Sequence, residues 1–431
     1  MRYKNPSKAL FKHNRHNFSS QLLPHSLAIF HSNECYPRNA DLFHSFIQES
    51  DFYYLSGIDQ EESILLLAPN HPNENLREVL FIRKSDKTTI TWEGPKLSEN
   101  QASEISGICT VYNHDSFENV LRELILNTEN IYLNFNEYPK FFSEVLDKNQ
   151  RMAESYIKKF STHQFKRSAP ILRELRMIKS EEEITQIKKA CHITGRSFDN
   201  LLRKLKPGMM EYQAQAEIEY MFSYNGSNRP AYDTIVAGGE NACILHYVRN
   251  EDILNDGDLL LLDMGAEYGN YASDMSRTIP VNGKFSSRQK ECYNAVLDVF
   301  KKAKDLLIPG NTLDDVNNQV KEWMNETCIK LGLYSNKDVK RHGNYSQLLA
   351  QYFMHGTSHH LGLNVHDVFD KNAPFKEGMV FTCEPGIYIK KEKIGIRIEN
   401  DFLVTANGPV DLMEEIPIEI EEIEAIMNER K

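Results

Sequence analysis

The stretch Leu259–Asp263 reads L-L-L-L-D, and it constrains the fold more strongly than any other part of the sequence. Four consecutive leucines indicate a strand that is covered on both faces, and this strand ends on an acid. A second acid, Asp274, follows the turn-like segment Glu267–Asn270, so a hairpin can bring the two carboxylates side by side. Two carboxylates in an apolar setting are costly unless a cation neutralises them. A pair of solvated turn acids is the simpler interpretation, and the four leucines weigh against it.

The tract Met354–Asp367 contains four histidines: His355, His359, His360 and His366. Neutral imidazole can ligate a metal and can shuttle protons near pH 7. The alternation from His359 to His366 indicates an extended segment, although His355 and His359 are also spaced as they would be on one helix face. Buried, hydrogen-bonded histidines in an ordinary core remain the alternative for this tract alone.

Two glutamates follow short apolar runs near the end of the chain. Glu384 comes after Met379–Phe381 and before Pro385, where the strand should end because proline donates no ladder hydrogen bond. Glu399 lies in I-G-I-R-I-E, where strand alternation places Arg397 on the same face to orient it and balance its charge. Each glutamate alone would usually be a surface residue.

Taken together, these residues predict a metal centre. One imidazole and four carboxylates carry too much negative charge for one divalent ion, and they suit two ions bridged by carboxylates. Oxygen-rich ligation favours Mn²⁺, with Zn²⁺ or Co²⁺ as possible substitutes. The candidate ligands are Asp263, Asp274, His359, Glu384 and Glu399.

Composition excludes several other classes of protein. The net charge of −11 disfavours a nucleic-acid partner. Seven scattered cysteines without a C-x-x-C pair indicate reduced thiols in a cytoplasmic compartment. No apolar run approaches the ~20 residues that span a bilayer, so no membrane partner is expected. The basic N-terminus faintly resembles a transit peptide, but a solvated first helix is the preferred interpretation.

The 431 residues predict an α/β protein with two domains, residues 1–175 and 176–431. The first is a mixed α/β domain with a helix over Phe117–Ile125 and a polar linker at Ser161–Pro170. Its predicted strands are Leu27–Phe30, Ile64–Ala68, Val79–Arg83, Thr88–Trp92 and Ile131–Asn134.

The second domain combines long helices with strands. Capping boxes begin two of its helices, and Pro-Gly pairs end them. From Met354 onward, mostly strands and turns are expected. The predicted helices are Ser180–Lys206, Glu211–Tyr224, Ser286–Leu307 and Leu313–Leu331, and the predicted strands are Thr234–Ala237, Leu259–Met264 and Ala272–Thr278.

Five ordered motifs, which span almost the whole chain, resemble one family. They are S-D-F-Y-Y-L-S-G, T-I-V-A-G-G-E-N-A-C-I-L-H-Y followed by D-x₁₀-D, H-G-T-S-H-H-L-G-L-N-V-H-D, E-P-G-I-Y and G-I-R-I-E. The chain resembles the aminopeptidase P and prolidase branch of the creatinase/methionine aminopeptidase-like metallopeptidases. The resemblance implies a "pita-bread" α/β catalytic domain with two metals, and it places the five candidate ligands at the family's ligand positions.

The resemblance also assigns roles around the metals. His246 matches a histidine beside the substrate, and His355 and His366 match the other two active-site histidines. Residues that match the pocket for the proline ring are His355, Tyr388 and Arg397. Tyr232 resembles a wall of the pocket for the first residue of the substrate.

Two residues of the first domain complete the comparison. Asp41 and Trp92 match positions that close bacterial relatives present at the active site. The counterpart of Trp92 comes from a neighbouring subunit of a tetramer, which implies a homo-oligomer, either a dimer or a tetramer. His360 and Asn364 depart from the residues that many relatives carry, which puts substrate preference in doubt but not the metal site.

The expected activity is that of a metallo-aminopeptidase. It would release the N-terminal residue from peptides with proline at position two, by attack of a hydroxide that bridges two metals. Glu384 would move the proton and His366 would stabilise the oxyanion. The alternatives are a prolidase, which accepts only X-Pro dipeptides, and a catalytically inactive peptide-binding module of the same fold.

Overall fold

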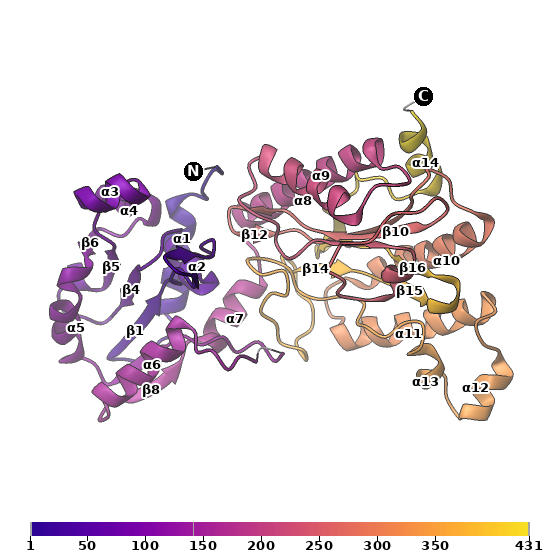
Figure 1. Cartoon of the computed structure of the whole chain (residues 1–431). Coiled ribbons are helices and arrows are strands. Elements are labelled where there is room, and N and C mark those ends of the chain that lie inside the picture. The colour runs from indigo at the N-terminus through magenta and orange to yellow at the C-terminus, as the bar shows by residue number, and fades with distance from the viewer. Residues whose placement is uncertain (1, 141, 430–431) are drawn as a thin grey trace. The chain divides into compact units, whose positions relative to one another are not determined.

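The computed structural model describes residues 2–140 and 142–429, and the chain divides into two units. Asn5–Arg176 forms the N-terminal unit, and Met1–Lys4 with Met177–Lys431 forms the C-terminal unit. Each unit has sheets, helices and a buried core of its own (Figure 1). No helix in the described part of the chain combines the length and the apolar character that crossing a bilayer requires.

A six-stranded mixed sheet forms the centre of the N-terminal unit, in the order β6-β5-β4-β1-β7-β8. Strand β1 is buried throughout, and it pairs antiparallel with β4 and parallel with β7. Four of the five predicted strands, β1, β4, β5 and β7, are confirmed. The strands of this unit are β1 Ser26–His31, β2 Pro37–Asn39, β3 Leu42–Phe43, β4 Ile64–Leu67, β5 Glu78–Ile82, β6 Thr110–Asn113, β7 Asn130–Leu133 and β8 Gln164–Arg167.

Helices of this unit pack apolar side chains into its core. Helix α5 has the predicted bounds, and it buries Phe117, Leu121 and Leu124. The expected first helix, α1, is present but is not simply solvated, because Phe11 and Phe18 are fully buried. The helices are α1 Lys8–Ser19, α2 Ser50–Ser56, α3 Lys87–Glu93, α4 Glu99–Ser106, α5 Phe117–Ile125, α6 Lys148–Lys159 and α7 Ala169–Met177.

Two predictions for this unit are wrong. Thr88–Trp92 was expected to be a strand and lies within helix α3, because the Asp86 side chain accepts a hydrogen bond from the Thr89 N–H at 2.7 Å and so caps the helix. Ser161–Pro170 was expected to be a linker. It contains strand β8, which pairs parallel with β7, and the first residues of α7.

The C-terminal unit has antiparallel sheets between helices. Figure 1 shows α8 and α9 on one side of the strands and α10 and α11 on the other. Strand β10 lies between β13 and β9, and its four leucines are buried. The strands are β9 Ile235–Gly238, β10 Leu259–Met264, β11 Glu267–Tyr268, β12 Tyr271–Ala272, β13 Met275–Pro280, β14 Val380–Cys383, β15 Gly386–Ile389, β16 Ile394–Arg397, β17 Asn400–Leu403 and β18 Val410–Asp411.

All four helices predicted for this part of the chain are confirmed. Ser180 and Glu183 form the predicted reciprocal cap at the start of α8. The sequence pattern did not predict the final helix, α14. The helices are α8 Glu181–Lys204, α9 Glu211–Tyr224, α10 Ser287–Ala303, α11 Leu313–Lys330, α12 Asn336–His342, α13 Ser346–Leu349 and α14 Ile420–Asn428.

A small hairpin, β11–β12, connects the strands that bear the two aspartates. Its turn residues, Gly269 and Asn270, have φ values of 59° and 65°, as a two-residue turn of this kind requires. Residues 2–4 pack against this hairpin: the Tyr3 ring lies 6.1 Å from the Tyr268 ring, and Asn270 Nδ2 donates to the Tyr3 hydroxyl at 3.2 Å. The first residues of the chain therefore belong to the C-terminal unit.

Candidate metal centre

The strand pairing of β10 with β13 brings Asp263 and Asp274 together. Asp263 pairs with Ser276, and Asp274 lies two residues before Ser276, directly ahead of β13. The Tyr232 hydroxyl lies 2.6 Å from Oδ1 of each aspartate. The hairpin therefore does what the sequence predicted, and Tyr232 contacts both acids directly.

Glu399 and Arg397 approach the same aspartates from the end of β16. Arg397 Nη2 donates to Asp263 Oδ2 at 2.6 Å. Arg397 Nε donates to Ser276 Oγ at 2.7 Å, and Ser276 Oγ in turn donates to Glu399 Oε2 at 2.7 Å. The predicted common face of Arg397 and Glu399 is present, and Ser276 links the two side chains.

A buried arginine fixes the backbone behind this cluster. The Arg277 guanidinium is fully buried, and Nη1 donates to the carbonyl oxygens of Ser276 and Glu399 at 2.9 and 2.7 Å. Five donors in a rigid fork can satisfy several carbonyls at once, which makes arginine suited to this position. The backbone positions of Ser276 and Glu399 are therefore coupled.

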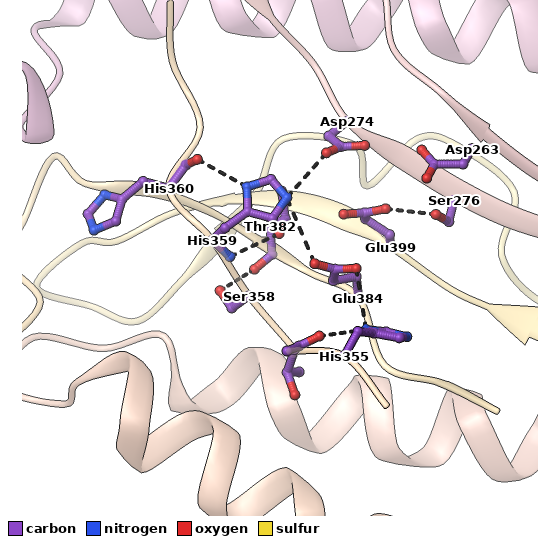
Figure 2. A network of polar contacts seen from close by, with 12 residues as sticks. Asp263, Asp274, Ser276, His355, Ser358, His359, His360, Thr382, Glu384 and Glu399 are labelled. Carbon is purple, nitrogen blue, oxygen red and sulfur yellow. Dashed lines mark hydrogen bonds and ion pairs between the residues drawn. The ribbon is translucent and has the colours of Figure 1, made fainter. Parts of the chain in front are cut away.

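His359 and Glu384 come from two segments that run side by side. The Thr382 N–H donates to the His359 carbonyl, and the Glu384 N–H donates to the Thr357 carbonyl, at 3.0 and 2.8 Å. His359 Nε2 lies 3.4 Å from Asp274 Oδ2 and 3.8 Å from Glu384 Oε1 (Figure 2). Its Nδ1 lies 3.1 Å from the His360 carbonyl, which leaves Nε2 free to ligate a cation.

The expected extended segment is only partly present. His360 forms a bridge with Phe381, and the Leu361 N–H donates to the Val380 carbonyl, so pairing with β14 continues to Leu361. From Gly362 to His366 the chain is a series of bends, and the prediction is wrong there. The Gly362 N–H donates to the Asn364 carbonyl and so turns the chain away from β14.

Of the five candidate ligands, Asp274 and Glu399 are buried, and Asp263, His359 and Glu384 are half-buried. Potential ligand atoms of Asp274, His359 and Glu399 all lie within 4.8 Å of one another. Burial, followed by repulsion from Asp263, raises the pKa of Asp274 well above its ordinary value. Burial and repulsion from Asp274 likewise raise the pKa of Glu399. These acids can ionise together only beside added positive charge, so the donor set fits divalent cations.

A hydrogen-bonded chain lies on the other side of Arg397. Arg397 Nη1 donates to the Tyr388 hydroxyl at 2.9 Å, and that hydroxyl lies 2.8 Å from His355 Nε2. Burial raises the pKa of Tyr388 to about 12, so its hydroxyl keeps a proton to donate to His355. The His355 proton is therefore assigned to Nδ1, which donates to the Gly356 carbonyl at 2.6 Å.

His355 is neutral at physiological pH. Burial and then the positive charge of Arg397 lower its pKa to about 4, and the charge of His246 contributes in the same direction. His355 Nδ1 also lies 3.7 Å from Glu384 Oε2, beside the carboxylate cluster. The side chains predicted to line the proline pocket are thus joined to one another and to the acids.

The other two candidate histidines are exposed. The His366 ring lies edge-on to the His359 ring with centroids 4.5 Å apart. His246 lies in an irregular segment after the 3₁₀ helix η3, Gly239–Cys243. His360 is buried, packs against the tilted ring of Phe381 and points away from the carboxylates (Figure 2), whereas Asn364 is exposed.

Asp41 and Trp92 lie in the N-terminal unit. Asp41 is exposed in the turn between β2 and β3, and the Trp92 side chain in α3 is 83% exposed. Their expected role beside the substrate stays a prediction.

Sequence reasoning missed three residues of the site: Ser276, Arg277 and Asp401. Asp401 Oδ2 accepts the Asp274 N–H at 3.0 Å and the Cys191 thiol at 3.3 Å. Alternation along β13 could have found Ser276, because it lies two residues after Asp274 and therefore on the same face. No local pattern indicates Asp401, since its partners are distant in sequence.

Comparisons with known proteins agree with this geometry. Residues 185–406 match the model of metallopeptidase family M24, and residues 11–132 match the N-terminal domain of aminopeptidase P. The chain is 35% identical to the Xaa-Pro aminopeptidase of Escherichia coli over 98% of each chain. It is 30% identical to human Xaa-Pro aminopeptidase 3 over 92% of this chain and 80% of the relative.

Solved structures show the same architecture over the whole chain. Aminopeptidase P from Escherichia coli with the inhibitor Pro-Leu superposes with a TM-score of 0.89, at 32% identity and with 99% of each chain covered. Aminopeptidase PepP of Pseudomonas aeruginosa gives the same values. The predicted α/β fold class is therefore confirmed. The chain belongs to metallopeptidase family M24 and, within it, to the aminopeptidase P group.

Proposed function

We propose that this protein is a metal-dependent aminopeptidase that releases the N-terminal residue of peptides with proline at position two. The observation that carries the proposal is the convergence of four carboxylates and one imidazole from separate strands and loops. The relatives named Xaa-Pro aminopeptidase support this activity over that of a prolidase. An inactive peptide-binding module is disfavoured because the residues of the ligand set are all present.

Asp263, Asp274, His359, Glu384 and Glu399 would hold the two divalent ions, with Mn²⁺ as the preferred metal because the set is rich in oxygen. When bound, such ions would acidify water to a nucleophile near neutral pH and polarise the carbonyl under attack. Tyr232, Arg397 and Ser276 would hold the carboxylates in place through the hydrogen bonds described above.

The residues around the carboxylates would move protons and stabilise charge. Glu384, between His359 and His355, would accept the proton of the attacking water and deliver it to the proline nitrogen. That nitrogen carries no hydrogen in the peptide, so it must gain a proton to leave. His366, exposed beside His359, would donate a hydrogen bond to the developing oxyanion.

The remaining residues would bind the substrate. The joined side chains of His355, Tyr388 and Arg397 would form a wall of the proline pocket, and His246 would hold the substrate carbonyl. Tyr232 would limit the pocket for the first residue. We keep Asp41 as a partner for the substrate amine, and Trp92 as a residue that a neighbouring subunit contributes.

The broader expectations belong to the same proposal. We infer domains at 1–175 and 176–431, with residues 2–4 packed on the second domain, and we infer a cytoplasmic location and a homo-oligomer. The match of one family model to residues 11–132 and of another to residues 185–406 supports the two domains. Sedimentation of the purified protein would measure the oligomeric state.

One assay tests the activity. Hydrolysis of Arg-Pro-Pro is measured with added Mn²⁺, after chelation, and again after Mn²⁺ is restored. Release of arginine that chelation abolishes and Mn²⁺ restores is expected. Cleavage of Gly-Pro with no cleavage of Arg-Pro-Pro would instead identify a prolidase. Full-length protein that binds no metal and cleaves neither peptide would identify a binding module.

A further inference from the structure

We propose that Glu211 is a positioning residue for the reaction: its buried carboxylate holds the segment that carries His246, and Tyr247 is its main partner there. This inference rests on the proposed function, because it takes the role of His246 beside the substrate from that function. Glu211 is the first residue of α9, far along the chain from the metal ligands, and it is 0% exposed.

The carboxylate of Glu211 accepts hydrogen bonds from both ends of one segment. Oε1 accepts the Gly238 N–H at 2.8 Å and Asn241 Nδ2 at 3.0 Å. Oε2 accepts the Asp252 N–H at 3.0 Å. Because Gly238 and Asp252 bind the same carboxylate, residues 238–252 form a loop that is closed at its base.

The fourth donor lies next to His246. The Tyr247 hydroxyl donates to Glu211 Oε2 at 2.7 Å, and the Tyr247 ring is 7% exposed, in a core cluster with Tyr388. A buried carboxylate is costly unless its oxygens accept several hydrogen bonds, and these donors meet that need. His246 itself is exposed, so its position depends on the neighbour that is anchored.

Strand β16 supports the loop from another side. A Cβ placed on Gly395 would lie 2.1 Å from the Ala242 carbonyl oxygen, so the loop and the strand are in close backbone contact. The Cys243 thiol also donates to the Ile394 carbonyl at 3.5 Å. These contacts hold the start of the loop, and Tyr247 with Glu211 holds the part that bears His246.

Chemistry at His246 requires accurate placement, since catalytic groups lose effect when they are misplaced by a fraction of a bond length or more. Irregular segments reach such accuracy only through side-chain anchors, because no backbone ladder fixes them. Removing the Tyr247 hydroxyl deletes one anchor and leaves the ring packing in place. The change should therefore reach the substrate through His246 and leave the metal ligands unaffected.

The test is a double-mutant cycle with Tyr247→Phe and His246→Ala in the full-length, metal-loaded protein. Tyr247→Phe is expected to lower kcat/KM for Arg-Pro-Pro by about 10-fold, the loss of one buried hydrogen bond. In the His246→Ala background, the same change should cost little more, because the two residues act as a unit. Tyr212→Phe, which removes an exposed hydroxyl one residue from Glu211, is the matched control and should behave as wild type.

Metal content by elemental analysis should be the same in all these variants. Amide hydrogen exchange over residues 238–252 should be faster in Tyr247→Phe than in Tyr212→Phe, and this readout needs no activity. Glu211→Gln, which keeps the side-chain volume, should show both effects more strongly and serves as the second variant.

Several outcomes would overturn the inference. They are wild-type kcat/KM for Tyr247→Phe, a full additive loss in the His246→Ala background, or unchanged exchange over residues 238–252. Loss of bound metal in Tyr247→Phe would also overturn it, because the effect would then act through the ligands. Failure of the wild-type protein to cleave Arg-Pro-Pro would overturn the proposed function instead, and exchange would still report on the anchor.

Discussion

The two sides of the candidate site are built differently. On the acid side, Asp263 lies within a central strand, and Asp274 and Glu399 are almost fully buried and bonded to fixed partners. On the histidine side, His246 and His366 are exposed on segments without regular structure. The comparison teaches that the sheet fixes the positions of the carboxylates that would bind cations. The histidines that would contact the substrate are held in position by a few side-chain anchors. Substitutions should therefore separate metal binding from turnover.

The largest effect is expected at Glu384, where the two sides meet. Glu384→Gln should fold, keep its metal and lose turnover by up to about 10⁴-fold, because the amide cannot carry the proton. Steady-state kinetics on Arg-Pro-Pro and elemental analysis measure the two properties. Near-normal cleavage by this variant would refute the role assigned to Glu384. It would also show that turnover does not depend on the residue at which the two sides meet.

His366 tests the histidine side alone. His366→Ala should lower kcat by about 10²-fold through loss of a hydrogen bond to the oxyanion. Its exposure and position outside the ligand set predict unchanged metal content. Elemental analysis beside single-turnover kinetics checks both statements. A variant that loses its metal would place His366 on the acid side.

Ser276 tests the acid side alone. Ser276→Ala removes the hydroxyl that joins Arg397 to Glu399, and we expect metal affinity to fall by about 10-fold or more. Calorimetric titration with Mn²⁺ measures the change. Ser276→Thr keeps the hydroxyl and is the matched control. Equal affinities for the Ala and Thr variants would show that the hydroxyl does not hold Glu399.

His355 tests the comparison through stability alone. Its pKa is about 4 in the folded protein and about 6.5 when unfolded, so the folded state binds fewer protons between these values. The stabilising contribution is present above pH 6.5 and is lost as pH falls towards 4. At pH 5 the unfolded imidazole is charged, and the loss relative to pH 7 is about 2 kcal/mol.

Urea unfolding of chelated wild-type protein and His355→Gln at pH 7 and pH 5 measures this contribution. The variant should lose about 2 kcal/mol less than the wild type over that interval. Equal losses would mean that His355 is protonated in the folded protein. The chain from Arg397 through Tyr388 would then not set the charge of His355.

Sequence patterns predicted the acid side well because its geometry follows from local rules. Four leucines and the acid that follows them define β10, and hairpin pairing then brings Asp274 close to Asp263. The alternation of Arg397 and Glu399 likewise follows from strand geometry. Thr88–Trp92 misled the analysis, because β-branched and aromatic residues favour strands while the Asp86 cap favours the observed helix.

The histidine side was less predictable. Residues 362–366 bend where alternation predicted extension, and hydrogen bonding of Gly362 to Asn364 cannot be foreseen from periodicity. The hydrogen bonds of Glu211 join it to residues that lie 27 to 41 positions away. Contacts of this kind arise only when the whole unit has folded, so no local signal marks them.

Residues 2–4 must dock late in biosynthesis. Their partner, the hairpin around Tyr268 and Asn270, is translated only after the complete N-terminal unit has been made. Residues 2–4 therefore stay undocked until that hairpin has left the ribosome. A fusion partner attached before Tyr3 would lie beside the turn that links the two aspartate strands. An affinity tag at this end would therefore lie close to the residues that position Asp263 and Asp274.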